Sequence, residues 1–168
     1  FVDLCDTFNL PLAFLHDVPG LLVGGEAEKT GILKAYERLA LRISTATVPK
    51  VGVVIRKAYG GGHFAMGGRP LHPDFLFAWP IAELGFMAPD TGVRTVYRRR
   101  LEDILAREGV EARDQAAARM EVEWTAESEP WEAAAHLSLD DVIEPARTRD
   151  ILIQALRFAW GDRPRVTA

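Results

Sequence analysis

The sequence predicts an α/β fold in which strands alternate with helices around a parallel or mixed sheet. Residues 12–15 and 51–55 are short apolar runs typical of buried strands, and an amphipathic helical pattern over 32–43 lies between them. Glycine-rich loops follow both strands, at Val23-Gly24-Gly25 and at Gly60-Gly61-Gly62. Ligands of such sheets bind at the carboxyl ends of the strands, so we expect a site where these loops meet.

The first sixty residues contribute a helix end, a strand, a helix and a second strand. Residues 1–8 resemble the second half of an amphipathic helix, and Pro19-Gly20 marks a turn after the strand at 12–15. Val48-Pro49 ends the helix over 32–43, because the residue before a proline disfavours helical backbone. The run at 51–55 is rich in β-branched residues and leads into the glycines, after which Phe64 begins another helix.

The second half of the chain predicts shorter strands and more helix. Further strands are expected at 74–79, 82–87 and, as an edge strand, 140–143. Helices are expected at 91–120 with an interruption at Gly109, at 130–135, and from Thr148 to a stop at Gly161. We expect residues 1–161 to form the domain and residues 162–168 to be a frayed tail.

Composition narrows the classes of function. The 168 residues suffice for one domain with its own core, and a net charge of −4 gives no reason to expect nucleic acid or an anionic membrane surface as a partner. No apolar run approaches the length of a membrane span. Cys5 is the only cysteine, which excludes an internal disulfide and fits a reducing compartment, so we expect a cytoplasmic protein. The chain opens in mid-helix at Phe1 rather than at a methionine, so we expect it to be part of a longer protein.

The glycines at 60–62 are the strongest candidate for chemistry. Glycine has no Cβ to keep a ligand from the main chain, and the start of a helix adds N–H groups without partners. Such a turn holds a phosphate, or an oxyanion formed during a reaction. A glycine-rich turn without any ligand is the alternative.

The sequence contains few of the side-chain motifs that are typical of catalysis or metal binding. There is no metal-ligand spacing, no G-x-S-x-G motif and no complete P-loop, and His16 and His72 stand alone, so we expect no metal. His63 donates a hydrogen bond or packs beside the turn, and Tyr59 stacks on a ligand or packs in the core. The run Arg98-Arg99-Arg100 is a solvated helix face or a site for an acidic ligand. If the chain catalyses, main-chain N–H groups are the expected donors.

Several motifs, in order from about Cys5 to Leu156, carry a family resemblance. They are Asp17-Val18-Pro19-Gly20, Val23-Gly24, Thr47-Val48-Pro49-Lys50-Val51, Arg56-Lys57-Ala58-Tyr59-Gly60-Gly61, Phe77-Ala78-Trp79-Pro80 and Asp140-Asp141-Val142-Ile143-Glu144-Pro145. Together they resemble the carboxyltransferase (β) subunits of biotin-dependent acyl-CoA carboxylases. The resemblance implies a crotonase-like (ClpP/crotonase) fold and a partial domain. It places residues 1–161 in the C-terminal carboxyltransferase domain, without its N-terminal part.

The resemblance also implies a site and a reaction. Gly61 and Gly62 correspond to the catalytic oxyanion hole whose backbone N–H groups stabilise the biotin enolate. The carboxyl group passes from carboxybiotin to the α, or vinylogous γ, carbon of an acyl-CoA. Biotin is carried on a separate domain or subunit, acyl-CoA is the substrate, and no metal takes part. The remaining residues expected to contact biotin or substrate are Gly20, Tyr59, Gly60, His63 and Phe64.

Partners and alternatives follow from the same resemblance. It implies biotin carboxylase and biotin carboxyl carrier subunits as partners, and a homo-oligomer, trimer or hexamer, in the complete protein. The acyl group, for example propionyl, methylcrotonyl or acetyl, stays open. A biotin-dependent decarboxylase or transcarboxylase subunit, and a non-catalytic assembly subunit, are the alternatives. In the family the N-terminal half holds the acyl-CoA thioester, so we expect this chain alone to be inactive and, with apolar surface uncovered, to self-associate.

Overall fold

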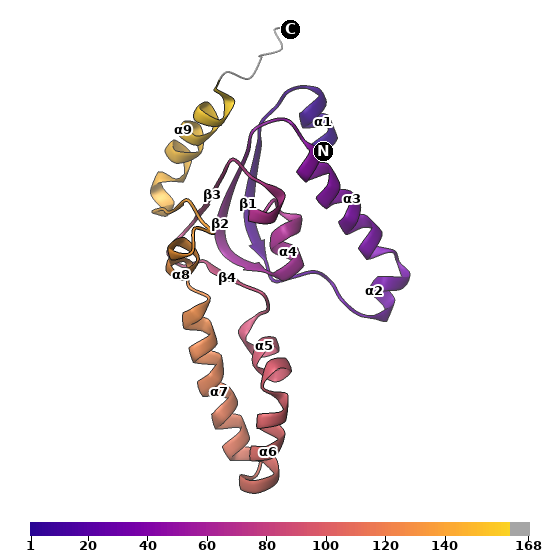
Figure 1. Cartoon of the computed structure of the whole chain (residues 1–168), viewed down its shortest axis with the longest axis vertical. Helices are drawn as coiled ribbons and strands as arrows, with labels where there is room; N and C mark the ends of the chain where they lie inside the picture. The colour runs from indigo at the N-terminus through magenta and orange to yellow at the C-terminus, as the bar shows by residue number, and fades with distance from the viewer. Residues whose placement is uncertain (162–168) are drawn as a thin grey trace.

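The computed structural model describes residues 1–161, and the predicted tail at 162–168 lies outside the described residues. The described part contains a parallel sheet in the order β1-β2-β3-β5, and β4 pairs with the far end of β2 (Figure 1). The strands are β1 (Leu12–Val18), β2 (Lys50–Tyr59), β3 (Phe75–Ala78), β4 (Glu83–Gly85) and β5 (Asp141–Val142). The expected α/β architecture is therefore confirmed, with β5 at an edge of the sheet.

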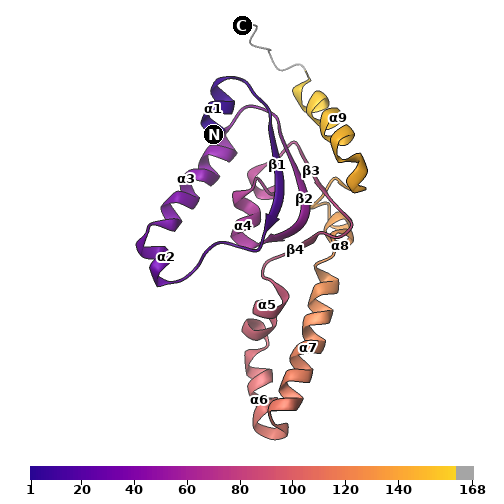
Figure 2. The same cartoon turned by 180° about the vertical axis from the view of Figure 1, so that it is seen from behind.

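Helices lie on both faces of the sheet and beyond its end. The helices are α1 (Val2–Thr7), α2 (Gly25–Lys29), α3 (Ile32–Thr45), α4 (Gly60–Ala65), α5 (Pro89–Val96), α6 (Arg98–Glu108), α7 (Val110–Glu127), α8 (Pro130–Ala135) and α9 (Thr148–Trp160), with 3₁₀ turns η1 (Arg69–Leu71) and η2 (Pro145–Arg147). In Figure 1, and from behind in Figure 2, α1, α3 and α4 lie on one side of the sheet and α9 lies on the other.

The core is built on β2, which lies between β1 and β3. Val51 and Val53 are fully buried on the face that packs against Ala155 of α9. Val54 and Leu76 are equally buried on the opposite face. Each such side chain stabilises the fold by about 1.5–3 kcal/mol relative to an exposed one. Because β2 is apolar on both faces, its position in the middle of a parallel sheet follows from its sequence.

An arm formed by α5, α6 and α7 extends beyond the carboxyl ends of the strands (Figure 1). It has its own small core of Val93, Leu101, Ala116 and Met120. The sequence predicts one interruption over 91–120, at Gly109, but the chain also breaks at Tyr97. The ring of Tyr97 packs edge-on against Trp124 of α7, with ring centroids 6.3 Å apart. This tertiary contact has no local sequence signal.

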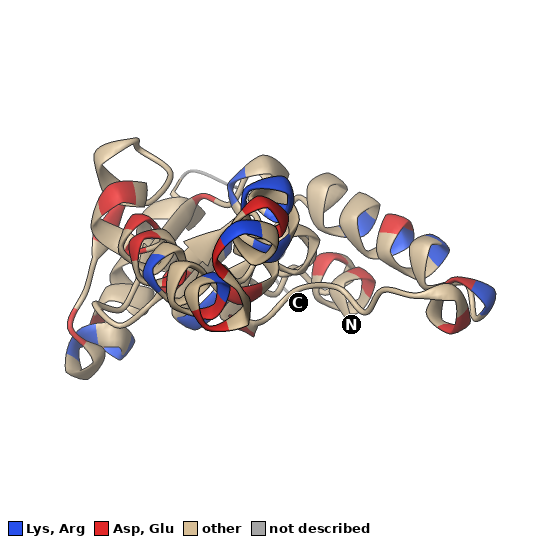
Figure 3. Ribbon diagram, turned by 90° about the horizontal axis from the view of Figure 1, so that it is seen from below, with Lys and Arg blue, Asp and Glu red and all other residues tan. Residues whose placement is uncertain are grey.

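Charges of both signs alternate along the helices of the arm (Figure 3). Arg98 pairs with Glu102 one turn later at 3.2 Å, and Arg113 pairs with its neighbour Asp114 at 2.7 Å. The residues of the Arg98-Arg99-Arg100 run are exposed. Mixed and paired charge favours a solvated helix face over a site for an acidic ligand.

Apolar side chains are exposed along α3 and the loop before α2. The helix over 32–45 is confirmed, but only Ile43 of its apolar stripe is buried, and Leu33 is 62% exposed. Leu22 and Val23 are 71% and 84% exposed. Only the C-terminal end of the stripe reaches the sheet, where Ile43 packs in one cluster with Leu12 of β1, because α3 extends away from the sheet towards α2 (Figure 1). Among the described helices, none has the length and apolar composition that a membrane span requires.

Candidate functional site

Helix α4 begins directly at the carboxyl end of β2, and its first turn consists of the glycines at 60–62. The sequence predicts these glycines as a loop before the helix, and the structure corrects this: they belong to the helix itself. Gly60 has a φ of +51°, and a Cβ there would lie 2.8 Å from the carbonyl oxygen of Phe86. Only glycine enters a helix from this conformation without strain.

The N–H groups of this turn are the available donors. First-turn N–H groups have no partner within their own helix. Among the described residues, no hydrogen bond outside the regular elements uses the N–H of Gly61 or Gly62 as donor. These two N–H groups therefore have no hydrogen-bond partner in the described structure, as the donors of an oxyanion hole require before a ligand binds.

The turn after β1 lies against α4 and brings Gly20 to Gly62. A Cβ at Gly62 would lie 2.9 Å from the carbonyl carbon of Gly20 and 2.7 Å from Cγ2 of Val18. A Cβ at Gly61 would lie 2.7 Å from Cδ1 of Leu21. Gly61 and Gly62, both predicted from sequence, thus pack so closely against the turn after β1 that a side chain at either position requires movement. Gly20 has open space around it, and its φ of +139° is what favours glycine there.

A cavity of about 520 Å³ opens beside this turn, and its wall includes Gly60, His63 and Phe64, all predicted from sequence. Across from them lie residues of β4, α8 and their flanking segments that sequence reasoning did not single out: Leu84, Phe86, Glu129, Glu132, Ala133 and His136. Apolar atoms make up most of the wall. Such a cavity suits a ligand with an apolar body and few polar groups.

Tyr59 faces the core instead of this cavity. Its side chain is buried, and its hydroxyl donates a hydrogen bond to the carboxylate of Glu83 on β4. Burial, with that carboxylate as the second cause, raises the pKa of the Tyr59 hydroxyl. Tyr59 and Glu83 line a different cavity, between β4 and the arm. Of the two interpretations that the sequence leaves open, core packing matches this placement.

His63 contacts a second histidine, His16, which sequence reasoning treated as isolated. Their Nδ1 atoms are 3.3 Å apart, and the His16 side chain is completely buried at the end of β1. Burial, followed by the nearby His63, lowers the pKa of His16 to about 3, and burial lowers that of His63 to about 4. Both rings are neutral at neutral pH. One sequence signal was available: His16 lies four residues after Leu12, so both side chains point to the same, core-facing side of the strand.

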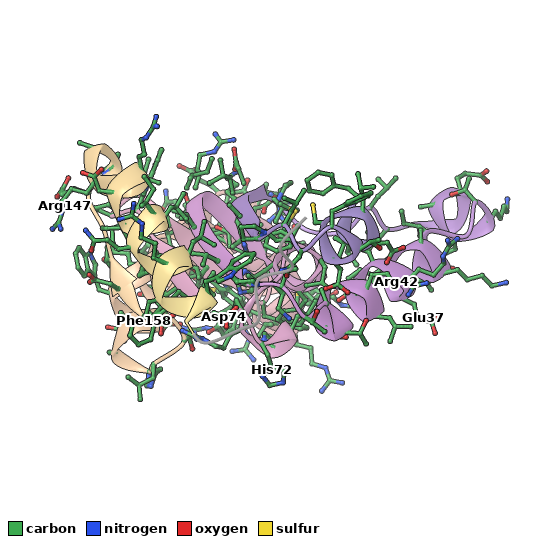
Figure 4. The ribbon with its side chains drawn as sticks, turned by 90° about the horizontal axis from the view of Figure 1, so that it is seen from above. Glu37, Arg42, His72, Asp74, Arg147 and Phe158 are labelled. Carbon is green, nitrogen blue, oxygen red and sulfur yellow. The ribbon has the colours of Figure 1, made fainter. Side chains whose placement is uncertain are left out.

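Several other polar and aromatic residues lie away from the turn. Figure 4 shows the molecule from above, at the amino ends of the strands, where His72 and Asp74 lie. Glu28 is exposed on α2. The indole of Trp79 donates a hydrogen bond to Thr148 at 2.9 Å and packs in the core beneath α9. In the described part of the chain, no group of three or more His, Cys, Asp or Glu side chains is arranged to hold a metal ion.

Comparisons with known proteins identify the family of the chain. A family model described as the carboxyl transferase domain matches residues 1–167. The methylmalonyl-CoA carboxyltransferase 12S subunit of Propionibacterium freudenreichii subsp. shermanii is 41% identical over 158 residues, which are 94% of this chain and 29% of that protein. The methylmalonyl-CoA decarboxylase subunit alpha of Propionigenium modestum is 37% identical over 171 residues, 100% of this chain and 32% of that protein.

A solved structure of a related protein also matches the fold of this chain. The transcarboxylase 12S crystal structure, a hexamer with methylmalonyl-coenzyme A and methylmalonic acid bound, superposes with a TM-score of 0.86 at 37% identity, covering 99% of this chain and 31% of that one. The chain thus spans about a third of the length of these relatives. With a family model matched over nearly its whole length, the chain belongs to the carboxyl transferase domain family of acyl-CoA carboxylase β and 12S subunits, and its α/β fold is crotonase-like.

Proposed function

We propose that this chain forms the biotin-binding half of a carboxyltransferase site, at which a carboxyl group moves from carboxybiotin to the α, or vinylogous γ, carbon of an acyl-CoA. The observation that carries the proposal is the free pair of N–H groups at Gly61 and Gly62, held against Gly20 at the carboxyl end of β2. Biotin arrives on a separate carrier, and residues 1–161 act as one domain of a larger site.

The residues fit the ureido group of biotin. Two adjacent backbone N–H groups match one carbonyl oxygen, and no side chain at 60–62 obstructs the approach. When bound, carboxybiotin supplies the activated carboxyl group. Gly61 and Gly62 would donate hydrogen bonds to the ureido oxygen, which gains negative charge as that group leaves. The proton lost from the acyl-CoA carbon would pass to the ureido nitrogen that released the carboxyl group. Losing one donor of this kind typically costs about 2.7–4 kcal/mol of transition-state stabilisation.

The histidine beside the turn is suited to donate a hydrogen bond and not to remove a proton. With a pKa lowered to about 4, His63 is a weak base at neutral pH. His63 and Phe64 line the cavity beside Gly60, and we assign them to contacts with biotin or the acyl group. Tyr59 supports the site through Glu83, because its hydroxyl is engaged there.

Decarboxylation or transcarboxylation at the same site is the second candidate, because two of the relatives carry those names. The proteins that bind the complete protein would distinguish carboxylation from decarboxylation. A biotin carboxylase and a carrier subunit indicate carboxylation, and a membrane decarboxylase complex indicates decarboxylation. We also propose that the complete protein is cytoplasmic and forms a homo-oligomer, as the 12S protein forms a hexamer.

The test is transfer of a labelled carboxyl group. The protein that carries this chain is supplied with a biotin carboxylase, a biotinylated carrier, ATP, [¹⁴C]bicarbonate and propionyl-, acetyl- or methylcrotonyl-CoA. We expect acid-stable label in at least one acyl-CoA, dependent on the carrier. No label in any acyl-CoA, together with no transfer from a labelled methylmalonyl-CoA to the carrier, would refute the function and favour a non-catalytic assembly subunit.

A further inference from the structure

His16 and His63 form the one side-chain hydrogen bond between β1 and α4 among the described residues. Their Nδ1 atoms are 3.3 Å apart, and the ring centroids are 5.3 Å apart at an angle of 53°. A neutral imidazole carries a single N–H, so one ring donates from Nδ1 and the other accepts at Nδ1. The direction of this bond decides which nitrogen of His63 carries the proton.

The surroundings of His16 select one direction. Its Nε2 atom is buried and has no hydrogen-bond partner. A Cβ at Gly52 would lie 3.0 Å from this Nε2 and 2.6 Å from Cδ1 of Leu76, so the ring edge packs against backbone and an apolar side chain. A buried N–H without an acceptor is rarer and costlier than a buried bare acceptor. The His16 proton therefore belongs on Nδ1, where it is donated to His63.

The position of the His16 proton determines the tautomer of His63. Its Nδ1 accepts, so its own proton is on Nε2. A Cβ at Gly68 would lie 2.5 Å from this Nε2, so the atom lies beside the Gly68 backbone. Unlike the Nε2 of His16, it is not a buried unpaired group, and the His63 side chain forms part of the wall of the cavity beside Gly60. A neutral donor at this place complements the backbone donors of the adjacent turn.

We propose that His16 is a positioning residue that fixes the tautomer of His63, so that His63 presents Nε2–H to a carbonyl or carboxylate oxygen of the ligand in this cavity. The inference rests on the proposed function for the identity of that ligand. The oxygen belongs either to the carboxylated biotin or to the acyl-CoA, and the experiment distinguishes these sources.

The experiment compares two substitutions of His16. His16→Leu removes the donor, and His16→Asn keeps an amide N–H close to the position of Nδ1. His72→Leu is the matched control, because His72 is exposed at the amino ends of the strands, away from the glycine turn (Figure 4). The ¹⁵N chemical shifts of the His63 ring report its tautomer directly in the protein without substrate. Steady-state kinetics report kcat and the KM values for carrier and acyl-CoA.

We expect the wild-type protein, His16→Asn and His72→Leu to hold the His63 proton on Nε2, and His16→Leu to show both tautomers. His16→Leu should lower kcat/KM by about fivefold to tenfold, the value of one ordered neutral hydrogen bond, and His16→Asn should restore most of it. A change confined to KM for the carrier assigns the oxygen to biotin, and one confined to KM for acyl-CoA assigns it to the acyl substrate.

A wild-type His63 protonated on Nδ1 would overturn the inference. So would a His16→Leu protein with unchanged tautomer and kinetics. If His16→Leu does not fold, the wild-type tautomer and the His16→Asn protein decide the matter. Because the tautomer is measured without turnover, a wild-type protein that transfers no carboxyl group would refute the proposed function while leaving this result intact.

Discussion

The hydroxyl of Tyr59 donates a hydrogen bond to the carboxylate of Glu83, and this bond connects the last residue of β2 to the first residue of β4. The two strands pair in parallel here, with Lys57 opposite Glu83 and Tyr59 opposite Gly85. The bond therefore holds the strand end from which the glycine turn starts. Tyr59, which the sequence predicts to contact the ligand, thus lies in the core and supports the glycine turn from there.

Tyr59→Phe is expected to lower the free energy of unfolding by about 1–3 kcal/mol, because the half-buried Glu83 loses its donor. KM for carrier and acyl-CoA should stay unchanged. Urea denaturation and steady-state kinetics measure the two effects. Tyr97→Phe, on the arm, is the matched control and should leave both quantities unchanged. A Tyr59→Phe protein of normal stability with a raised KM would instead show that the hydroxyl contacts ligand.

The buried histidines predict a pH dependence of stability. Burial lowers the pKa of His16 from 6.5 to about 3 and that of His63 from 6.5 to about 4. As pH falls below 6.5, the unfolded chain binds protons that the folded chain does not, so the free energy of unfolding decreases. The loss is up to about 1.4 kcal/mol per pH unit for each ring, and it ends near the folded pKa values.

Urea denaturation between pH 8 and pH 4.5 checks this window. Near pH 8 both rings are neutral in both states and contribute almost no slope. His16→Leu should reduce the slope below pH 6.5, because it removes one of the two buried rings. Equal slopes in the wild-type protein and His16→Leu would contradict the assigned burial of His16.

The strands and most helices could be predicted because their signals are local. The β-branched run at 51–55 and the apolar spacing over 32–43 each specify an element without reference to the rest of the chain. The helical character of Gly60–Gly62 could not be predicted, because glycine is intrinsically a poor helix former. In this structure the glycine turn follows directly from the end of β2 and packs against the backbone of Gly20, and these tertiary contacts favour its helical conformation.

The candidate site depends only in part on local signals. Gly61 and Gly62 could be proposed because a glycine run after a strand indicates close backbone approach, whereas Gly20 was proposed from the family resemblance. The contact of His16 with His63 spans 47 residues, and sequence spacing carries no information at that distance. The far wall of the cavity, from Leu84 to His136, likewise depends on how β4 and α8 pack. Nothing local distinguishes its glutamates from solvated surface residues.

The exposed apolar residues predict self-association. Leu22, Val23 and Leu33, on α3 and the loop before α2, are 71%, 84% and 62% exposed, and apolar side chains exposed in this way favour contact with a second copy of the chain. Sedimentation velocity over a range of concentrations should show oligomers for the wild-type chain. The double substitution Leu22→Glu and Leu33→Glu should shift the distribution towards monomer. A wild-type chain that stays monomeric at high concentration would contradict the expectation.

The most direct test of the central claim is carboxyl exchange by a Gly62→Val protein. The valine side chain would meet the backbone of Gly20, where even a Cβ would lie 2.9 Å from its carbonyl oxygen, and would displace the N–H groups of the turn. Gly25→Val is the control, because a Cβ at Gly25 meets nothing within 4 Å. Label transfer between carrier and acyl-CoA should fall by about 10²-fold or more in Gly62→Val, with thermal stability recorded alongside, and should be nearly unchanged in Gly25→Val. A folded Gly62→Val protein that exchanges label at the wild-type rate would contradict the claim that this backbone turn carries the chemistry.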